Sequence, residues 1–436
     1  MVEKAYKKDI FMFLKKCRLC ESKKLFKFLD LGFHPPSDQF KKKIELNNPT
    51  IYYPLKVYSC INCGFKQLGY VVDPKILYQQ NYPYESSLTN LGKKHYGEFA
   101  KSIVKEYNLN KNDLSVDIGS NTGVLLSAFK KNNLKIVGID PAPNICKIAI
   151  RKGIPTISSF FNRDAVNKIL KKHGRAKVIT GTNVFAHVND LTIFMRNIKR
   201  LMHKKKGIFV IEVPHFFHLI KYLEYDTIYH EHLSYITVIP LISFFKKFNL
   251  EITDVKQKDI HGGSIRIFIS EIGNYKVKNT VRKTCKIENK AKLNSKKVLI
   301  NFQKKVVQNR IKLTSLLTKL KKMNKKIIAL SAPAKGMILL NYCKFDGDFI
   351  DYATEKSSIK QGLFTPGTNI PVFSDDKILK TKPDYALLLA WNFSKEIVKN
   401  NIKYLKKGGK FIIPIPNIKI IDNKKWERQK KNNSQR

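Results

Sequence analysis

The sequence is short of acidic residues and has no long apolar run. Asp and Glu number 34 against 82 Lys and Arg, so the formal net charge is +48. No apolar run approaches the roughly 20 residues that a helix needs to cross a bilayer. The first residues, MVEKAYKKDIFMFLKKC, carry scattered charges and lack the apolar core of a signal peptide. We therefore expect a cytoplasmic protein with no membrane partner.

The positive charge has two interpretations. A strongly basic protein can bind nucleic acid or another phosphate-rich partner. Alternatively, AT-rich coding can raise the lysine content without any partner. The lysines are spread over the whole chain, and aromatic residues do not alternate with arginine in any stretch. We favour the second interpretation and consider nucleic acid an unlikely partner.

Cysteine is scarce, and its number, seven, is odd, which argues against a disulfide framework. Four cysteines form two CxxC pairs, and these are Cys17, Cys20, Cys60 and Cys63. Two such pairs can complete a tetrahedral, all-thiolate zinc site. A redox CxxC is the alternative, but two pairs near one end of the chain favour structural zinc. Gly64, next to Cys63, suits the tight turn that such a site needs.

A length of 436 residues fits two or three domains. We expect a small zinc-binding module at 1–80, a Rossmann-like α/β domain at 81–285 and a second α/β domain at 286–436. Strand-like and helix-like stretches alternate in the middle part, which predicts a mainly parallel sheet covered by helices. The predicted strands there are LSVDIGS, LKIVGID, AKVITGTNVFA, KGIFVIEVP and GGSIRIFIS. Residues 286–322 predict one amphipathic helix that links the domains.

The stretch VDIGSNTGVLL, residues 116–126, has the form of a strand, a glycine-rich turn and a helix start. Asp140 ends the next predicted strand, where an acidic residue can bind the hydroxyls of a ribose. The turn lacks the G-x-G-x-x-G pattern that favours a pyrophosphate. It suits a cationic ligand with an amino-acid tail, such as S-adenosylmethionine. A strand and turn of the same shape without a ligand is the alternative.

The stretch YHEHLSY, residues 229–235, gathers five side chains that can donate, accept or transfer a proton. Metal binding is one explanation, but HEH lacks the H-E-x-x-H spacing of zinc proteases. Acid–base catalysis is the other explanation, since an imidazole is well matched to neutral pH.

Together these motifs resemble the three-domain sugar C-methyltransferases that act on nucleotide-linked deoxysugars. The resemblance rests on CRLC with CINCG, NYPYESSLTN, VDIGSNTGVLL, GTNVFAHVND, EVPHFFHLIKYLEYDTIYHEHLSYIT, HGGSIRIF and SAPAKG. It implies a class I methyltransferase domain that binds S-adenosylmethionine, and a C-terminal α/β domain that contributes to nucleotide-sugar binding. The implied substrate is a 4-keto-deoxysugar on a nucleotide, methylated at the carbon next to the ketone through an enolate.

The resemblance also assigns roles by position. For the methionine part of the donor it implies Asp117, Gly119, Asn121 and Gly123, for its ribose Asp140, and near the sulfonium or adenine Asn183 and Phe185. For catalysis it implies His232 as base, Glu231 as a second base or orienting group, Tyr229 as a donor to the oxyanion, His187 from a separate strand end, and Tyr82 or Tyr84.

Two glycine-containing stretches complete the predicted site. HGGSIRIF predicts close backbone approach, so His261, Ser264 or Arg266 are candidates for contact with the sugar or a phosphate. SAPAKG follows a predicted strand, where a helix start and Lys335 suit the diphosphate of the substrate. We expect a monomer or weak dimer. The rival functions are methyl transfer to oxygen, nitrogen or another ketone, and a zinc-containing nucleic-acid-binding protein.

Overall fold

A computed structural model describes residues 12–79, 82–83, 90–260 and 262–434. The chain forms two compact units, and both are built from separate stretches of sequence. The first unit contains residues 1–27, 57–217 and 231–295, and the second contains 28–56, 218–230 and 296–436. These two units do not follow the boundaries predicted at residues 80 and 285. The division into three domains therefore stays a prediction.

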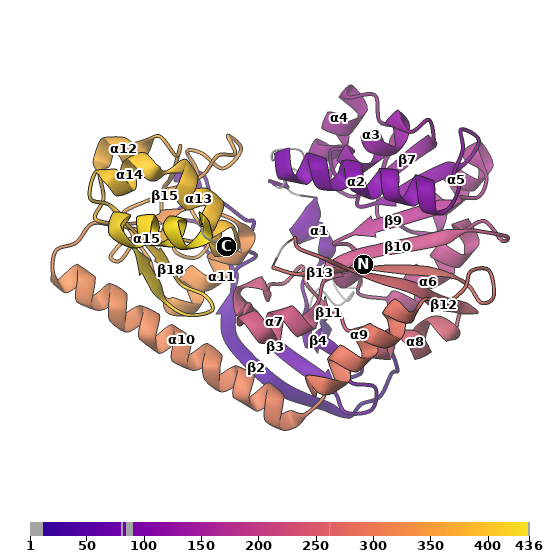
Figure 1. Cartoon of the computed structure of the whole chain (residues 1–436), viewed down its shortest axis with the longest axis horizontal. Helices are drawn as coiled ribbons and strands as arrows, with labels where there is room; N and C mark the ends of the chain where they lie inside the picture. Colours follow the sequence, from indigo (N-terminus) through magenta and orange to yellow (C-terminus); the bar gives the residue numbers. More distant parts are fainter. Residues whose placement is uncertain (1–11, 80–81, 84–89, 261, 435–436) are drawn as a thin grey trace, which may run out of the picture. The chain divides into compact units, whose positions relative to one another are not determined.

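A seven-stranded sheet forms the centre of the first unit (Figure 1). In spatial order its strands are β12 (Leu250–Lys258), β13 (Ser264–Glu271), β10 (Ile208–Pro214), β9 (Val178–Thr182), β6 (Leu114–Ile118), β7 (Lys135–Asp140) and β8 (Thr156–Ser158). The pairs among β10, β9, β6, β7 and β8 are parallel, and β13 is antiparallel to both of its neighbours. The mainly parallel sheet predicted from the sequence is confirmed.

Side chains that alternate along the strands build an apolar core on each face of this sheet. On β10, Phe209 and Ile211 belong to one core and Ile208 and Val210 to the other. Strands buried on both faces need helices on both sides. The helices are α2 (Asn90–Glu106), α3 (Val124–Lys131), α4 (Pro143–Arg151), α5 (Arg163–His173), α6 (Leu191–Leu201), α8 (Val238–Lys246) and α9 (Asn279–Lys290).

The cysteine-rich part is built from β-strands that range from 2 to 10 residues in length. A four-stranded sheet has the order β11 (Ser234–Tyr235), β4 (Lys66–Leu68), β3 (Tyr53–Cys60) and β2 (Leu25–His34), and β1 (Met12–Phe13) pairs with β5 (Tyr70–Val71). Helix η1 (Lys43–Glu45) and helix α1 (Pro74–Tyr78) complete this part. Because β11 pairs with β4, the chain just after the YHEH stretch lies against the cysteine-rich strands.

The single helix predicted for residues 286–322 is wrong. The structure has two helices, α9 and α10 (Lys296–Lys322), with a break between them. Lys292 has a positive φ of 50° in that break, a conformation that a helix does not contain. The apolar spacing continues through the break, which is why the sequence pattern alone did not reveal it.

The second unit has its own six-stranded sheet. Its order is β16 (Val372–Phe373), β15 (Ala353–Thr354), β14 (Ile327–Leu330), β17 (Tyr385–Leu388), β18 (Lys410–Ile413) and β19 (Lys419–Ile421), with only β19 antiparallel. The strand order reverses between β14 and β17, and this is where open α/β sheets bind ligands. The predicted second α/β fold is confirmed.

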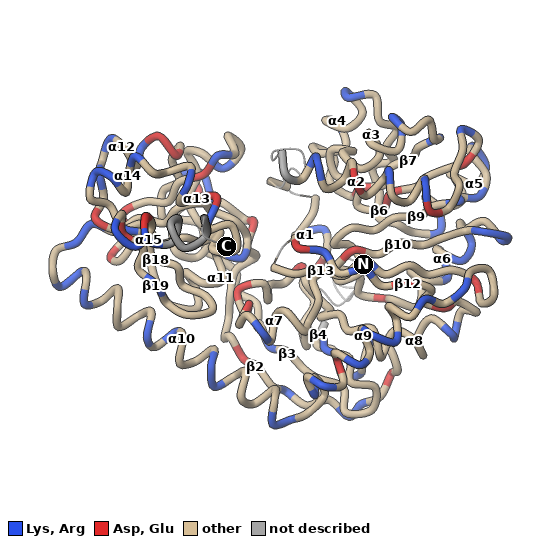
Figure 2. The backbone as a smooth tube through the Cα atoms, viewed as in Figure 1, with Lys and Arg blue, Asp and Glu red and all other residues tan. Residues whose placement is uncertain are grey.

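Helices surround the second sheet. They are α10, α11 (Ala334–Cys343), α12 (Lys377–Thr381), α13 (Ser394–Asn400), α14 (Ile402–Lys406) and α15 (Asn423–Ser434), with η4 (Trp391–Phe393). Before them, α7 (Phe216–Tyr222) and η3 (Tyr225–Thr227) lead the chain into and through this unit. Among the described helices, none is both long and apolar enough to span a bilayer. Lysines and arginines are spread over both units and lie on every described α-helix, whereas the central strands β6, β9, β10, β14 and β17 have none (Figure 2).

Candidate active site and zinc centre

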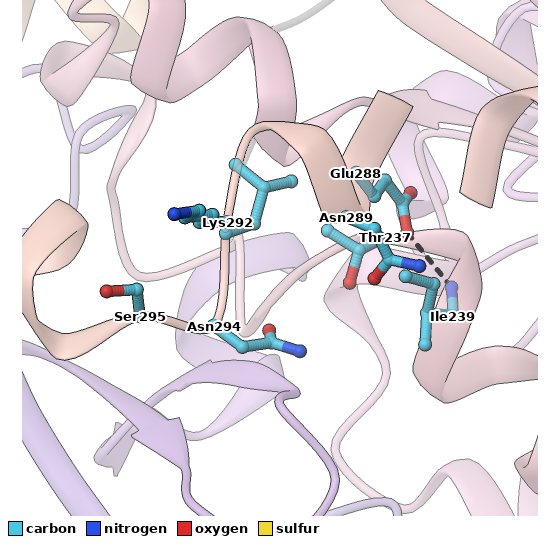
Figure 3. A pocket seen from close by; sticks show the side chains of 8 residues that line it. Thr237, Ile239, Glu288, Asn289, Lys292, Asn294 and Ser295 are labelled. Carbon is cyan, nitrogen blue, oxygen red and sulfur yellow. Dashed lines mark hydrogen bonds between the residues drawn. The ribbon is translucent and has the colours of Figure 1, made fainter. Parts of the chain in front are cut away.

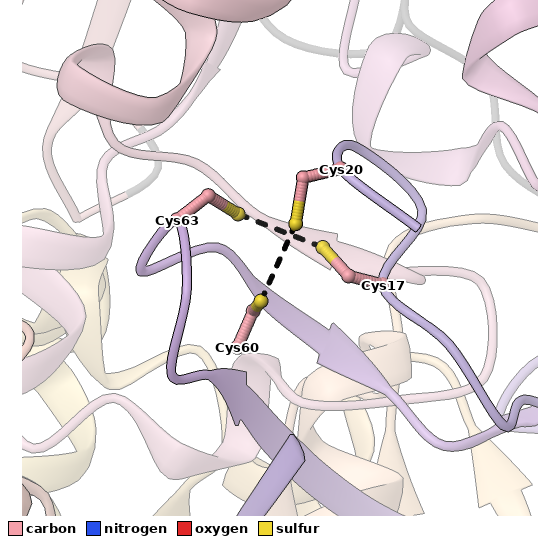
Figure 4. Close-up of side chains that lie close together, drawn as sticks. All are labelled: Cys17, Cys20, Cys60 and Cys63. Carbon is pink, nitrogen blue, oxygen red and sulfur yellow. Dashed lines mark hydrogen bonds between the residues drawn. The ribbon is translucent and has the colours of Figure 1, made fainter. Parts of the chain in front are cut away.

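The four cysteines of the CxxC pairs come together in the first unit (Figure 4). Their sulfur atoms all lie within 4.8 Å of one another, with Cys17 Sγ 3.6 Å from Cys63 Sγ and Cys20 Sγ 3.5 Å from Cys60 Sγ. A tetrahedral zinc with Zn–S bonds of about 2.3 Å places its sulfurs about 3.8 Å apart. The hydrogen bond from Cys63 lowers the pKa of Cys17 to about 5. The geometry fits a structural zinc ion held by four thiolates.

The same turns also position residues outside the cysteine cluster. Gly64 has φ +76°, and its amide donates to the carbonyl of Cys60 at 2.9 Å, as predicted for a tight turn. Arg18, between the first two cysteines, is buried and donates from Nη1 to the carbonyls of Leu68 and Leu233, each at 3.0 Å. Through Arg18, the cysteine cluster therefore supports the loop that contains Leu233 and, two residues earlier, Glu231.

Strands β6, β7 and β9 are neighbours, so their carboxyl ends meet at one edge of the sheet. The turn after β6 contains Gly119 at φ +64°, Asn121 at φ +49° and Gly123 at φ +76°. A Cβ on Gly119 would lie 2.4 Å from the side chain of Val184, and one on Gly123 would lie 2.9 Å from Ile154. Glycine is therefore required at both positions for two reasons: a side chain would clash with a neighbouring residue, and other residues rarely adopt a positive φ.

Two acidic residues lie under this turn. Asp117 is buried and accepts a hydrogen bond of 2.6 Å from Thr180 Oγ1. Burial, with a smaller effect from Asp140, raises the pKa of Asp117 to about 7. The carboxylate of Asp140 accepts from the amides of Asn121 and Ala142, both at 2.9 Å, and burial raises its pKa. Asp140 therefore fixes the backbone of the edge while Asp117 holds the Thr180 side chain, and each oxygen of Asp140 keeps a lone pair for a ligand.

The end of β9 is the third strand end at this edge of the sheet. Asn183 adopts φ +58°, its amide donates to the carbonyl of Glu212 at 2.7 Å, and its buried Oδ1 has no hydrogen-bond partner among the described residues. Phe185, predicted beside the donor, has no exposed surface and packs against Phe194 and Phe245 in the core. Because the ring has no exposed surface, it is not available to contact a ligand. Phe185 instead supports the end of β9 from within the core.

The edge fits a sulfonium donor on three counts. It combines acidic side chains with two glycines at close approach, and it holds an orphaned amide oxygen on Asn183. It has no run of free backbone amides, since the amide of Asn121 is used by Asp140. Helix α4, which follows Asp140, lines a cavity of about 290 Å³ together with Gln79; the lining residues of α4 are Pro143, Asn144, Lys147, Ile148 and Arg151.

The YHEH stretch divides at the boundary between the two units. Tyr229 and His230 belong to the second unit, and Glu231 and His232 belong to the first. His230 is buried, and its Nε2 lies 3.3 Å from the carbonyl oxygen of Tyr53. Burial lowers the pKa of His230 to about 3, so it is neutral at ordinary pH. The role of His230 is therefore structural. Glu231 and His232, by contrast, contact residues of the first unit.

In the first unit these two residues join an aromatic and imidazole cluster. The hydroxyl of Tyr82 donates to Glu231 Oε2 at 3.2 Å. The rings of His187 and His232 lie 5.1 Å apart between centroids. His187 follows the end of β9 on the short helix η2 (Phe185–His187). Sequence reasoning predicted these four side chains from three separate stretches, and the structure brings them together.

Tyr78 is a member of this cluster that the sequence did not suggest. It ends α1, and its hydroxyl lies 3.2 Å from His187 Nδ1, while its ring is 5.7 Å from that of Tyr82. Tyr78 lies four residues before Tyr82, and this spacing is the one sequence signal that links it to the NYPY motif. Tyr84, the alternative to Tyr82, lies outside the described residues.

The HGGSIR stretch has a structural role in the described residues. Arg266 is buried and binds Glu212 Oε2 through Nε at 2.8 Å and Nη2 at 2.7 Å, while Glu212 Oε1 lies 2.5 Å from His95 Nε2. Ser264 is buried and donates to the carbonyl of Ile260. Both side chains bind other groups of the protein, and substrate contacts of Ser264 and Arg266 stay a prediction. His261 lies outside the described residues.

Lys335 lies at the reversal point of the second sheet. It begins α11 after β14, and its ammonium group donates to Asn392 Oδ1 and lies 4.4 Å from the centre of the Trp391 ring. Trp391 donates to Asp226 at 2.6 Å. Burial, followed by the effect of Asp226, raises the pKa of Glu224 to about 8.

A smaller cavity of about 80 Å³ lies beside the start of α8 (Figure 3). Glu288 in its wall accepts from the amides of Val238 at 2.6 Å and Ile239 at 3.1 Å, and from His215 Nε2 at 2.9 Å. These bonds cap α8, so the polar groups here serve the fold.

Comparison with known proteins now adds to this geometry. Three family models match successive parts of the chain, and they describe a zinc binding domain at residues 17–78, a methyltransferase domain at 93–255 and a C-methyltransferase C-terminal domain at 259–416. A C-methyltransferase, NovU of Streptomyces niveus, is 30% identical over 414 residues, which cover 95% of this chain and 98% of that protein.

Solved structures give more distant likenesses. A S-adenosylmethionine-dependent methyltransferase from Clostridium acetobutylicum is 12% identical with a TM-score of 0.33, over 42% of this chain and 92% of that one. Magnesium protoporphyrin IX methyltransferase from Synechocystis, with S-adenosylmethionine bound, is 9% identical with a TM-score of 0.32, over 43% and 86% of the chains. Likenesses of this size add nothing to what the family matches show.

Proposed function

The chain belongs to the family of three-domain, S-adenosylmethionine-dependent C-methyltransferases with a zinc-binding domain, and we propose that it methylates a nucleotide-linked 4-keto-deoxysugar at the carbon next to the ketone. One observation carries the proposal. His187 lies four residues after Asn183, at the edge of the sheet proposed for the donor, and its ring faces His232. The loop after β9 therefore carries both Asn183 of the proposed donor edge and His187 of the acid–base cluster.

The reaction requires a nucleophilic carbon. A C–H bond has no lone pair, so the carbon must first lose its proton to a base. Next to a ketone, the electron pair of the broken C–H bond forms a C=C bond, and the carbonyl pair moves to oxygen as an oxyanion. S-adenosylmethionine supplies the methyl group as an electrophile on a positively charged sulfur.

The chain's own residues would perform the proton transfer. His232 and Glu231 are both candidates for the base, and the hydrogen bond from Tyr82 to Glu231 orients that carboxylate. Hydrogen bonds to the developing oxyanion stabilise the enolate, since preorganised donors act strongly in a site that excludes water. Tyr229 and His187 are the proposed donors. Tyr84 remains an alternative to Tyr82.

The donor and the nucleotide would use separate sheets. For the donor we propose the edge formed by Asp117, Gly119, Asn121, Gly123, Asp140 and Asn183. For the diphosphate of the substrate we propose the reversal point of the second sheet, with Lys335 at the start of α11 supplying positive charge. The hydrogen bond of Lys335 to Asn392 supports this, because it holds the ammonium group at the carboxyl edge.

A direct assay tests the proposal. The purified protein is incubated with S-adenosylmethionine and a panel of nucleotide-linked sugars, half with a 4-keto group and half with a hydroxyl there. Mass spectrometry should detect a gain of one methyl group only among the keto-sugars. Methylation of the hydroxyl sugars, or of no sugar at all, would reject the proposed substrate class.

A further inference from the structure

Tyr78 and His187 form an ordered pair within the candidate site. The hydroxyl of Tyr78 lies 3.2 Å from His187 Nδ1, and the two rings are nearly parallel, with 12° between their planes and 6.2 Å between their centres. Helix α1, which ends at Tyr78, is fixed at its start by Pro74 and by the Asp73 side chain, which accepts from the amide of Lys75 at 2.8 Å. Tyr78 is thus presented from a short but well-capped helix.

The other nitrogen of His187 has no such partner. His187 Nε2 is buried and makes no hydrogen bond to any described residue. Burial, with a further contribution from His232, lowers the pKa of His187 well below its ordinary value, so the ring is neutral. A neutral imidazole carries one proton, and the hydrogen bond at one nitrogen decides whether the other is a donor or an acceptor.

We propose that Tyr78 is a positioning residue that donates its hydroxyl proton to His187 Nδ1, and so keeps His187 in the tautomer whose Nε2–H is a hydrogen-bond donor for the substrate oxygen. This rests on the proposed function, because a donor is needed where the enolate oxygen develops. In the opposite tautomer a buried lone pair would face that oxygen and repel it. No proton transfers at His187: the N–H bond stays intact, and only the hydrogen bond strengthens as charge develops.

A neutral imidazole suits the position of His187 beside His232. A charged imidazolium next to His232 would compete with proton uptake there, since two positive rings 5.1 Å apart repel each other. A neutral N–H donor gives stabilisation at the oxygen without this cost. His187 would therefore act on the oxygen while His232 or Glu231 acts on the carbon.

The first test reads the tautomer without any substrate. In protein labelled with ¹⁵N-histidine, two-bond ¹H–¹⁵N spectra distinguish the protonated from the unprotonated ring nitrogen, and loss of a signal in His187→Gln identifies His187. We expect Nε2–H in the wild type, and a mixture of tautomers in Tyr78→Phe. The control is Tyr275→Phe, which also loses one hydrogen bond, from its hydroxyl to the carbonyl of Lys206 at 2.9 Å, and should keep the wild-type spectrum.

The second test replaces His187 by Gln or Asn, whose amide groups imitate different nitrogens of the imidazole ring. The amide nitrogen of Gln can occupy the place of Nε2, whereas that of Asn reaches only the place of Nδ1. His187→Asn should lower kcat by about 10²–10³-fold, as for loss of one oxyanion donor. His187→Gln should retain at least tenfold more activity than His187→Asn. Tyr78→Phe should lower kcat about tenfold with an unchanged KM for S-adenosylmethionine.

Each outcome supports or overturns the proposal. Protonation of Nδ1 in the wild type, or a tautomer unchanged in Tyr78→Phe, would overturn it, as would greater activity in His187→Asn than in His187→Gln. The spectra separate this proposal from the proposed function: if no keto-sugar is methylated but the tautomer follows Tyr78, the function fails and the role of Tyr78 in fixing the ring stands.

Discussion

Acidification should destabilise the second unit through two buried histidines. His34 and His230 are both almost fully buried, and their Nε2 atoms lie 2.9 Å from the carbonyl oxygen of Leu31 and 3.3 Å from that of Tyr53. Burial lowers the pKa of His34 to about 4 and that of His230 to about 3, with smaller effects from Lys344 and Arg310 on His34 and from His34 on His230. Between these values and the ordinary 6.5, the unfolded chain binds protons that the folded chain does not. The free energy of unfolding must therefore fall as the pH falls.

The magnitude follows from these pKa values. Between pH 7.5 and pH 5.5, each histidine reduces the free energy of unfolding by roughly 1 to 1.5 kcal/mol, and the two together by roughly 3 kcal/mol. Glu224 acts in the opposite direction, because burial raises its pKa to about 8 and the folded state then holds the extra proton. The wild-type pH dependence alone therefore does not isolate the histidines, and a comparison with variants is required.

Urea unfolding followed by tryptophan fluorescence is a suitable assay. The chain has two tryptophans, Trp391 and Trp426, and both belong to the second unit. In the double variant His34→Gln and His230→Gln, each amide can still donate to a carbonyl but does not titrate. Its loss of stability between pH 7.5 and 5.5 should be smaller than that of the wild type by roughly 3 kcal/mol. The control His203→Gln changes an exposed histidine and should follow the wild type. Parallel pH curves for the wild type and the double variant would refute the reasoning.

Three further perturbations should separate the roles of the zinc cluster, the glycine turn and the buried ion pair. Removing zinc with a chelator should release Arg18 from the segment that carries Glu231, so methyl transfer should fall at least tenfold and return when zinc is added back, with metal content measured in parallel. Gly119→Ala should weaken binding of S-adenosylmethionine at least tenfold by calorimetry, because the new Cβ would meet Val184 at 2.4 Å and the φ of +64° is unfavourable; unchanged affinity would contradict the proposed donor edge. Arg266→Met should cost about 3–5 kcal/mol of stability, because it removes the guanidinium partner of the buried Glu212 carboxylate. A raised substrate KM without loss of stability would instead support the predicted substrate role of Arg266.

The fold could be predicted well because its signals are local. Apolar runs such as KGIFVIEVP gave the central strands, and the spacing of the four cysteines gave the zinc cluster. The break between α9 and α10 was missed, since it depends on the backbone conformation around Lys292 and leaves the apolar spacing intact. Boundaries of this kind are decided by packing, which one sequence does not reveal.

The candidate site could be predicted only in part, for one physical reason. A polar or aromatic residue in a motif can face a ligand or another part of the protein, and the motif does not distinguish the two. Arg266 faces Glu212 because β10 and β13 pair in a register that places these residues opposite each other. Phe185 lies in the core, and Tyr78 joins the site through a contact with His187, 109 residues away. Long-range pairs like these become visible only in the folded chain.

The central claim is that this protein makes a carbon nucleophilic by removing its proton beside a ketone. The most direct measurement uses D₂O, with a nucleotide-linked 4-keto-sugar and the wild-type protein, and follows deuterium at the carbon next to the ketone by NMR. We predict deuterium there in the recovered substrate, a methyl group on that same carbon in the product, and loss of both in Glu231→Gln combined with His232→Asn. A product whose methyl group is on oxygen or nitrogen, formed without deuterium at that carbon, would contradict the account.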